Sequence, residues 1–226
     1  MQKMIIMISQ QKSKNAKKAV ALISGGIDSV VAAYLIQRQG IEVIPVYCDN
    51  SPFTDDSTKK RALDVIKQLA QKSGKPLKTY IVPNGDTQVA ILQNTPRKMT
   101  CVFCRRMMLR IAEKIAKKEK ASAVITGEAM GQKASQTLSN MLITTETIKM
   151  PVLRPLLGYD KIEIEKTAKE IGTFGLSIQP AVCCTITPEK PSTAARLEQI
   201  KEIEKIWDWR KAADSAANAA ESVYIG

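Results

Sequence analysis

The 226-residue sequence contains no histidine, and this absence limits its chemistry more than any other feature. Histidine is the usual acid–base group near neutral pH and a common metal ligand. A histidine-based catalytic triad and a histidine-ligated metal are therefore excluded. Any catalysis has to use cysteine, aspartate, glutamate, lysine or serine side chains.

Aromatic residues and long apolar runs are also scarce. Phe, Trp and Tyr make up only 4% of the residues, so we do not expect base stacking on aromatic platforms to dominate nucleic-acid binding. The longest apolar runs fall well short of the roughly 18 residues that a membrane span needs. The apolar start, residues 1–8, is too short for a signal peptide and lacks a small-residue cleavage site. We expect a cytoplasmic protein with no membrane partner.

Positive charge is abundant, with 34 Lys and Arg against 22 Asp and Glu, a net charge of +12. Lysines cluster within residues 12–18, 59–61 and 114–120. A polyanionic partner follows naturally, because each neutralised phosphate releases counterions. The alternative is that these lysines only solvate helix faces.

Strand and helix patterns alternate along the chain. Apolar, β-branched runs occupy residues 19–23, 42–48, 77–82, 123–126 and, less regularly, 147–153, and helical patterns occupy residues 30–39, 58–72, 102–118 and 161–171. This alternation predicts an α/β fold: a three-layer parallel sheet of about five strands with helices on both faces. Ligands then bind beyond the carboxyl ends of the strands.

Three regions follow from this pattern. We predict an N-terminal extension over residues 1–17, one α/β domain over residues 18–191 and a C-terminal helical extension over residues 192–226. Residues 192–222 fit one long helix or two, with an apolar stripe that favours packing against the domain or a second subunit.

A glycine turn follows the first predicted strand directly. Gly25 and Gly26 can take a positive φ and have no Cβ to block a phosphate, and the following helix presents its positive end. Ser24 and Ser29 add hydroxyl groups, and Asp28 adds a carboxylate that can orient a metal or a nucleotide. The turn therefore predicts a phosphate site, although an ordinary capped glycine turn has similar composition.

Five cysteines form two pairs and a single residue. Cys101 and Cys104 make a Cys-x-x-Cys at the start of a predicted helix and are followed by two arginines, features that favour thiolates. Cys183 and Cys184 lie in a proline-bounded loop. A zinc site would need all four, and adjacent cysteines chelate poorly. Three thiolates suit an iron–sulfur cluster instead, and incidental thiols remain the alternative. We interpret Cys48, in a predicted strand, as a core cysteine.

These segments resemble a known family. Residues 24–29 resemble the PP-loop of the ATP pyrophosphatases, which adenylate a carbonyl oxygen and replace it with nitrogen or sulfur. Residues 126–137 and 151–161 resemble successive blocks of the tRNA 4-thiouridine synthetase family, which residues 171–173 and 183–188 continue. The similarity runs in the same order from Lys18 to Ser192.

The resemblance implies cofactors and site residues. It implies ATP with Mg²⁺, bound by a set made of Ser24, Gly25, Gly26, Asp28, Ser29, Gly127 and Gln132. It implies catalytic roles for Asp28, for Lys161, which stabilises charge near the adenylated base, and for Cys184, which handles sulfur. Cys183 takes that role if the register differs by one. Cys101, Cys104 and Cys184 would bind the cluster. The alternative for Lys161 is a first-turn helix lysine that points to water.

The resemblance also implies partners: tRNA as substrate, and sulfide or a persulfide protein as sulfur donor. Family members usually carry N-terminal THUMP domains that bind tRNA, but only about 18 residues precede the first predicted strand here, and we expect no C-terminal rhodanese domain. Binding of tRNA then depends on the basic surface, on a homodimer or on a separate THUMP-domain protein. Two alternatives remain: an adenylating enzyme for a small metabolite, and a nucleotide-binding subunit without catalysis.

Overall fold

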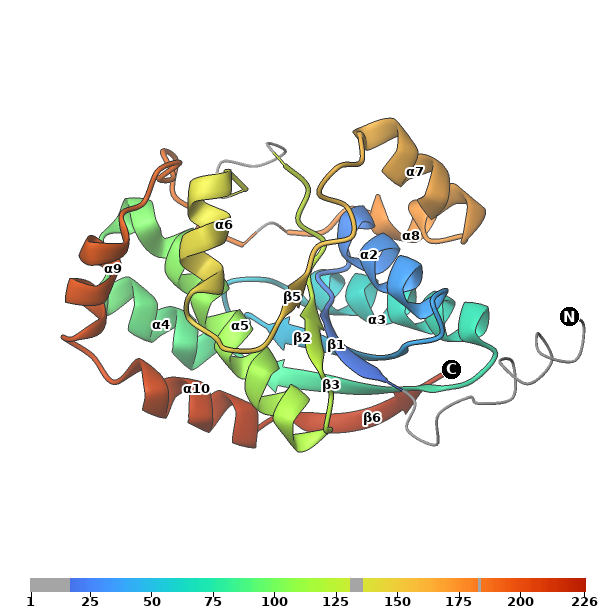
Figure 1. The fold of residues 1–226 in the computed structure, drawn as a ribbon, viewed down its shortest axis with the longest axis horizontal. Helices are drawn as coiled ribbons and strands as arrows, with labels where there is room; N and C mark the ends of the chain where they lie inside the picture. The colour runs from blue at the N-terminus through green and yellow to red at the C-terminus, as the bar shows by residue number, and fades with distance from the viewer. Residues whose placement is uncertain (1–16, 131–135, 183) are drawn as a thin grey trace, which may run out of the picture.

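A six-stranded sheet, in the order β5-β4-β1-β2-β3-β6, lies in the middle of the computed structural model, which describes residues 17–130, 136–182 and 184–226 (Figure 1). Five of these strands run parallel, and the last runs antiparallel to β3. The strands are β1 (Lys18–Leu22), β2 (Glu42–Asp49), β3 (Leu77–Pro83), β4 (Ala123–Ile125), β5 (Val152–Leu153) and β6 (Glu221–Ile225).

Helices cover both faces of the sheet, as predicted. One face carries α2 (Ile27–Gln37), α3 (Asp56–Ser73), α7 (Lys161–Glu170) and α8 (Phe174–Ser177). The other carries α4 (Gly85–Asn94), α5 (Thr100–Lys118), α6 (Leu138–Thr145), α9 (Leu197–Glu204) and α10 (Trp209–Asn218), with the short 3-10 turn η1 (Arg97–Met99) before α5.

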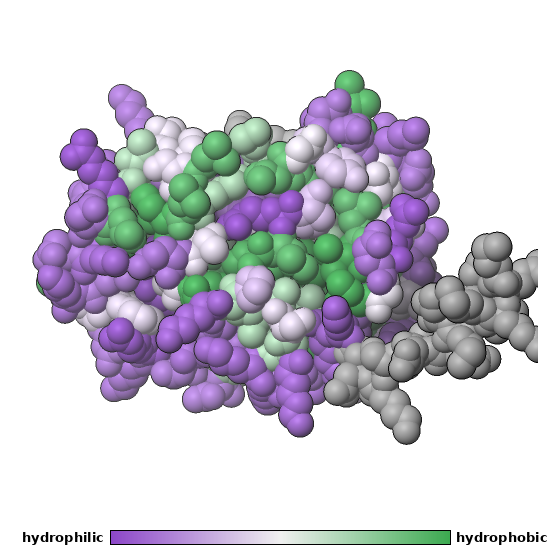
Figure 2. Space-filling model, in the orientation of Figure 1, coloured by the Kyte–Doolittle hydropathy of each residue, from purple (hydrophilic) through white to green (hydrophobic). Residues whose placement is uncertain are grey.

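The apolar core lies in two layers because strand side chains alternate between faces. In β1, Ala19 and Ala21 join the layer under α2 and α3, and Val20 joins the layer under α5. On the face of the molecule drawn in Figure 2, hydrophobic residues gather across the middle, around a hydrophilic group at the centre, and hydrophilic residues surround them. None of the helices described is long and apolar enough to cross a membrane.

Local sequence explains where two important helices begin. The Asp55 side chain accepts a hydrogen bond from the Thr58 backbone N–H and caps α3, which ends at the left-handed Gly74. Asp160 and Glu163 form a capping box at the start of α7. This box fixes the first helical residue, Lys161, at the carboxyl end of the sheet.

The predicted fold class is confirmed, with differences at the ends and in the short elements. The helical pattern over residues 192–222 forms two helices, one of the two predicted arrangements, but β6 was missed. The short helices α4, α6 and α8 were missed too. The proposed boundaries at residues 17 and 191 stay a prediction.

Candidate active site at the glycine turn

The glycine turn lies where the strand order changes direction. The chain leaves β1 toward β2 on one side, and β4 lies on the other side of β1. A crevice opens at such a switch point beyond the carboxyl ends of the strands. The turn after β1 and the segment after β4 therefore meet at one place, which agrees with the shared nucleotide site that the family resemblance implies.

Close packing makes glycine necessary at two positions of the turn region. Gly25 has a φ of +78°, and a Cβ there would lie 2.9 Å from the backbone nitrogen of Ala62 on α3. A Cβ on Gly127 would lie 2.5 Å from the backbone nitrogen of Ser29. The segment after β4 is thereby held against the first turn of α2.

The first turn of α2 is prepared for an anion. Its N-cap, Gly26, supplies no side-chain acceptor for the helix N–H groups, which leaves them available to a ligand. The Ser29 hydroxyl donates to the Gly26 carbonyl at 3.0 Å and accepts from the Ser24 N–H at 3.2 Å. These bonds fix both serines in the turn.

A cavity of about 230 Å³ opens beside this turn. Ser24, Gly26, Asp28 and Ser29 line it from the turn, and Gly127 lines it from the segment after β4. Of the residues predicted to bind ATP, Gln132 lies outside the described residues. The other lining residues are Leu22, Arg105, Met108, Leu109, Thr126, Glu128 and Gln136.

The Lys161 side chain reaches the glycine turn. Its ammonium nitrogen lies 3.1 Å from a carboxylate oxygen of Asp28. Because Lys161 comes from α7, this pair joins residues 133 positions apart in the sequence. Lys161 therefore meets the loop, and the alternative in which it points only to water is wrong.

Four polar residues that line the cavity, Arg105, Thr126, Glu128 and Gln136, were not predicted as site residues. Glu128 accepts hydrogen bonds from Arg105, from Arg154 at 2.6 Å and from the Thr126 hydroxyl at 3.1 Å. Gln136 is buried, and its side-chain oxygen has no partner among the described residues. Glu128 and Gln136 lie inside the segment 126–137 and Arg105 follows Cys104, so position near those motifs was the available signal.

The cysteines come together from three elements. Cys101 and Cys104 lie in the first turns of α5 as predicted, Cys48 lies near the end of β2, and Cys184 follows in the loop after α8. The charges of Cys184 and Cys101 raise the pKa of the Cys104 thiol, which puts both within electrostatic reach of it. Cys183 lies outside the described residues.

The predicted thiolate character of Cys104 is wrong for the chain as it stands. Burial raises the pKa of the Cys104 thiol to about 12, and the hydrogen bond from Gln88 at 3.2 Å and the charge of Arg105 lower it too little to compensate. Burial likewise raises the pKa of Cys48 to about 12. Cys48 is buried in the core, as predicted.

Among residues 17–130, 136–182 and 184–226, no three His, Cys, Asp or Glu side chains are grouped closely enough to hold a metal ion. A site for a single zinc ion is therefore not formed by these residues. A cluster of several irons spreads its ligands more widely than one ion does, and a set of three thiols is the donor chemistry that such clusters use.

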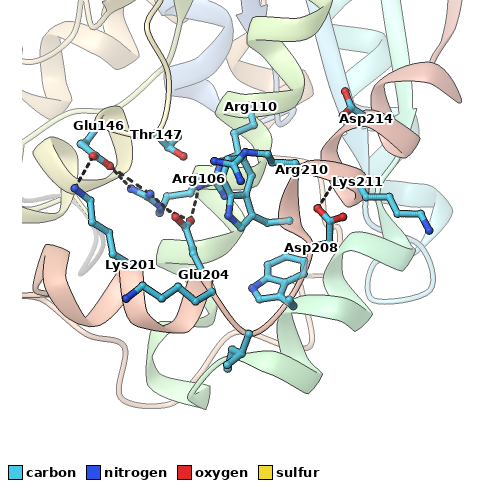
Figure 3. A pocket seen from close by; sticks show the side chains of 14 residues that line it. Arg106, Arg110, Glu146, Thr147, Lys201, Glu204, Asp208, Arg210, Lys211 and Asp214 are labelled. Atoms are coloured by element: carbon cyan, nitrogen blue, oxygen red, sulfur yellow. Dashed lines mark hydrogen bonds and ion pairs between the residues drawn. The ribbon is translucent and has the colours of Figure 1, made fainter.

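A larger cavity, of about 1180 Å³, lies between α5, α6, α9 and α10, away from the glycine turn (Figure 3). Residues that line this cavity form ion pairs with one another. Arg106 donates to both oxygens of Glu204 at 2.9 Å, and Arg110 also binds Glu204. Arg110 stacks on Trp209 with 3.5 Å to the ring centre. These contacts fasten the C-terminal helices to α5.

Comparison with known proteins identifies the family of this chain. A family described as "Thiamine biosynthesis protein (ThiI)" matches residues 14–208. A probable tRNA sulfurtransferase of Caldanaerobacter subterraneus is 42% identical over 200 residues, which cover 88% of this chain and 52% of the relative. One of Methanosarcina mazei is 42% identical over 205 residues, which cover 90% and 51%. The chain thus spans about half the length of these curated relatives.

Solved structures also match this chain. A 4-thiouridine synthetase solved with RNA and bound ATP matches with a TM-score of 0.89 and 36% identity, over 93% of this chain and 55% of that one. The NMN synthetase of Francisella tularensis matches with a TM-score of 0.57 and 16% identity, over 95% of this chain and 83% of that one. The second match shows the fold alone.

Proposed function

The chain belongs to the ThiI family, and from this premise we propose that it is an ATP-dependent tRNA sulfurtransferase that converts a uridine of tRNA to 4-thiouridine. The observation that carries the proposal is the cavity where the glycine turn, Asp28 and Lys161 meet. The similar 4-thiouridine synthetase was solved with RNA and ATP.

ATP binds with its phosphates against the glycine turn. Ser24, Gly25, Gly26 and Ser29 offer backbone N–H and hydroxyl donors at the positive end of α2. Asp28 fits Mg²⁺, because hard cations prefer carboxylate oxygens, and the ion would offset phosphate charge there. The positions proposed for Gly127 and Gln132 are beside the nucleotide.

Adenylation is the first chemical step. The O4 oxygen of uridine attacks the α-phosphorus of ATP as the N3 proton passes to water, the bond from that phosphorus to the bridging oxygen breaks, and pyrophosphate leaves with the electron pair. Negative charge grows on the departing group. The Lys161 ammonium, held 3.1 Å from Asp28, stabilises that charge in the transition state.

Sulfur transfer is the second step. Hydrosulfide attacks C4 of the adenylated uridine, the C4–O4 bond breaks, and AMP leaves with the electron pair. Cys101, Cys104 and Cys184 would hold an iron–sulfur cluster, which would supply an open iron for sulfide. If the protein binds no iron, Cys184 would take sulfane sulfur from a persulfide protein, and a second thiol would attack the Cys184 sulfur, form a disulfide with it and release the outer sulfur as hydrosulfide.

The net charge of +12 supports tRNA as the partner. Each phosphate that a lysine or arginine neutralises strengthens binding and makes it dependent on salt. We expect a second copy of the chain or a separate THUMP-domain protein to complete tRNA binding.

The test uses the 226-residue protein, reconstituted anaerobically with iron and sulfide and incubated with Mg²⁺, α-labelled ATP and tRNA. We expect AMP, pyrophosphate and 4-thiouridine together, and none of them with Asp28→Ala. Absence of AMP and pyrophosphate both with and without tRNA would contradict the proposal. Pyrophosphate release that does not depend on tRNA but increases when a small metabolite is added would support the alternative, in which that metabolite is adenylated. Iron and sulfide analysis of the same sample decides the sulfur carrier.

A further inference from the structure

A three-residue charge cluster forms part of the wall of the nucleotide cavity. Arg105 comes from α5, Glu128 from the segment after β4 and Arg154 from the segment after β5. Glu128 binds both arginines, and its side chain is only 8% exposed. The cluster has two positive charges and one negative charge, so it carries a surplus positive charge beside the cavity.

The cluster is firmly anchored on one side. Arg154 donates to Glu128 at 2.6 Å and to the Thr145 hydroxyl at 2.6 Å. Thr126 donates to the same oxygen of Glu128 at 3.1 Å. Glu128 is therefore fixed by partners that do not depend on Arg105.

Arg105 is the arginine of the cluster that lines the cavity; Glu128 lines it too, and Arg154 does not. Arg105 lines the same space as Ser24, Asp28 and Ser29. A guanidinium has five N–H donors in a planar fork, and Glu128 accepts one bond from Arg105. The remaining donors suit a phosphate, which accepts paired hydrogen bonds from arginine.

The surroundings of Arg105 indicate which phosphate it meets. Arg105 lies within electrostatic reach of the Cys104 thiol, whereas the glycine turn lies between β1 and α2. Sulfur attack and AMP departure occur at one carbon, so the group nearest the cysteines is the α-phosphate. The β- and γ-phosphates then lie toward the glycine turn.

We infer that Arg105 binds the α-phosphoryl group and stabilises AMP as a leaving group, and that Glu128 is the positioning residue that holds its guanidinium. The inference rests on the proposed function, because it takes an adenylating nucleotide to occupy the cavity. It adds to that function two separate binding sites: the glycine turn binds the pyrophosphate part of ATP, and Arg105 of α5 binds the AMP part.

Binding measurements on the iron-free 226-residue protein test this division. The probes are AMP and pyrophosphate, each titrated calorimetrically into wild type, Arg105→Gln and Arg105→Lys. Arg38→Gln is the matched control, since Arg38 is exposed at the C-cap of α2. We expect Arg105→Gln to weaken AMP binding about 10- to 100-fold, the loss of hydrogen bonds to a charged group, and pyrophosphate binding less than about threefold. Arg105→Lys keeps the charge and recovers part of the loss.

Glu128→Gln tests positioning separately. We expect kcat for AMP release to fall while KM for ATP changes little, because the arginine keeps its charge but loses its orientation. Equal AMP affinities in Arg105→Gln and Arg38→Gln, or equal losses of AMP and pyrophosphate affinity, would overturn the inference. If Arg105→Gln fails to fold, the ratio of AMP affinity to pyrophosphate affinity is measured in Arg105→Lys instead. A ratio equal to that of wild type would overturn the inference.

The two proposals fail in distinguishable ways. If wild type makes 4-thiouridine while Arg105→Gln binds AMP normally, only the role of Arg105 is wrong. If wild type binds AMP through Arg105 but never thiolates tRNA, the proposed reaction is wrong and the phosphate site stands.

Discussion

Two arginine–glutamate clusters include neighbouring residues of α5, Arg105 and Arg106. They differ in the direction that the arginine faces, in burial and in partners. Consecutive helical residues point about 100° apart, so Arg105 turns toward the glycine-turn cavity and Arg106 toward the C-terminal helices. Arg106 is 1% exposed and meets Glu204 and Glu146, whereas Arg105 shares one carboxylate with Arg154. The cluster around Glu204 is buried and holds helices together, whereas the Arg105 cluster lines a cavity and its surplus positive charge can meet an anion there.

Removing the carboxylate from the buried cluster gives the largest expected effect on stability. Glu204→Gln leaves Arg106 and Arg110 buried with a neutral partner. We expect a loss of about 3–5 kcal/mol of unfolding free energy, the cost of breaking a buried ion pair, measured by urea denaturation. AMP affinity of the folded protein should match wild type. A loss below about 1 kcal/mol would mean that this cluster is not structural.

Lowering the pH should reduce the difference in unfolding free energy between wild type and Glu204→Gln. Burial tends to raise the pKa of Glu204, but hydrogen bonding to Arg106 and the charge of Arg110 outweigh it and hold that pKa below its ordinary value. A depressed carboxyl pKa adds stability above the ordinary value of about 4.3, and this stability is lost as the pH falls through the folded-state pKa.

The stability difference between wild type and Glu204→Gln should therefore narrow below about pH 4.3, measured by urea denaturation at successive pH values. The pKa values of Glu113 and Glu119 are also lowered, but both proteins contain these groups, so their contributions cancel. A difference that widens toward low pH would contradict the assignment.

The equivalent change in the cavity cluster should cost less stability. In Glu128→Gln, Arg105 and Arg154 remain 21% and 14% exposed and can recruit water. We expect a loss of about 1–3 kcal/mol, that of a hydrogen-bonded charged group, in the same denaturation assay. Pyrophosphate should still stabilise the variant. A loss of unfolding free energy equal to that of Glu204→Gln would contradict the proposed difference between the two clusters.

The smallest expected effect comes from the aromatic partner of the buried cluster. Trp209→Leu removes the ring on which Arg110 stacks at 3.5 Å. We expect a loss of about 1 kcal/mol, typical of a part-buried cation–π contact, read from the thermal midpoint. No measurable shift would show that Glu204 alone holds Arg110.

The phosphate turn could be predicted because its signals are local. Glycines after an apolar strand, a helix start and the alternation of elements predict that Ser24–Ser29 lies at the carboxyl ends of the strands. The contact between Lys161 and Asp28 fits the role that the family resemblance gave to Lys161. The roles of these residues in the reaction stay predictions.

The two arginine clusters could not be predicted, because their partners are far away in sequence. Glu128 lies 23 residues from Arg105, and Glu204 lies 98 residues from Arg106. Nothing in adjacent residues 105 and 106 distinguishes them. The Cys104 thiol was mispredicted for a similar reason, since its burial depends on packing between elements. Strand β6 was missed because its residues are mostly exposed and its partner is the free edge of β3.

The most direct test of the account is the ratio of AMP to 4-thiouridine formed by the 226-residue protein from ATP, Mg²⁺, sulfide and tRNA. Nucleoside digestion of the tRNA and nucleotide analysis of the same reaction give both quantities. Adenylation followed by sulfur transfer predicts one AMP for each 4-thiouridine and no thiolation without ATP. Thiolation that proceeds without ATP, or ATP consumed only to ADP, would contradict it.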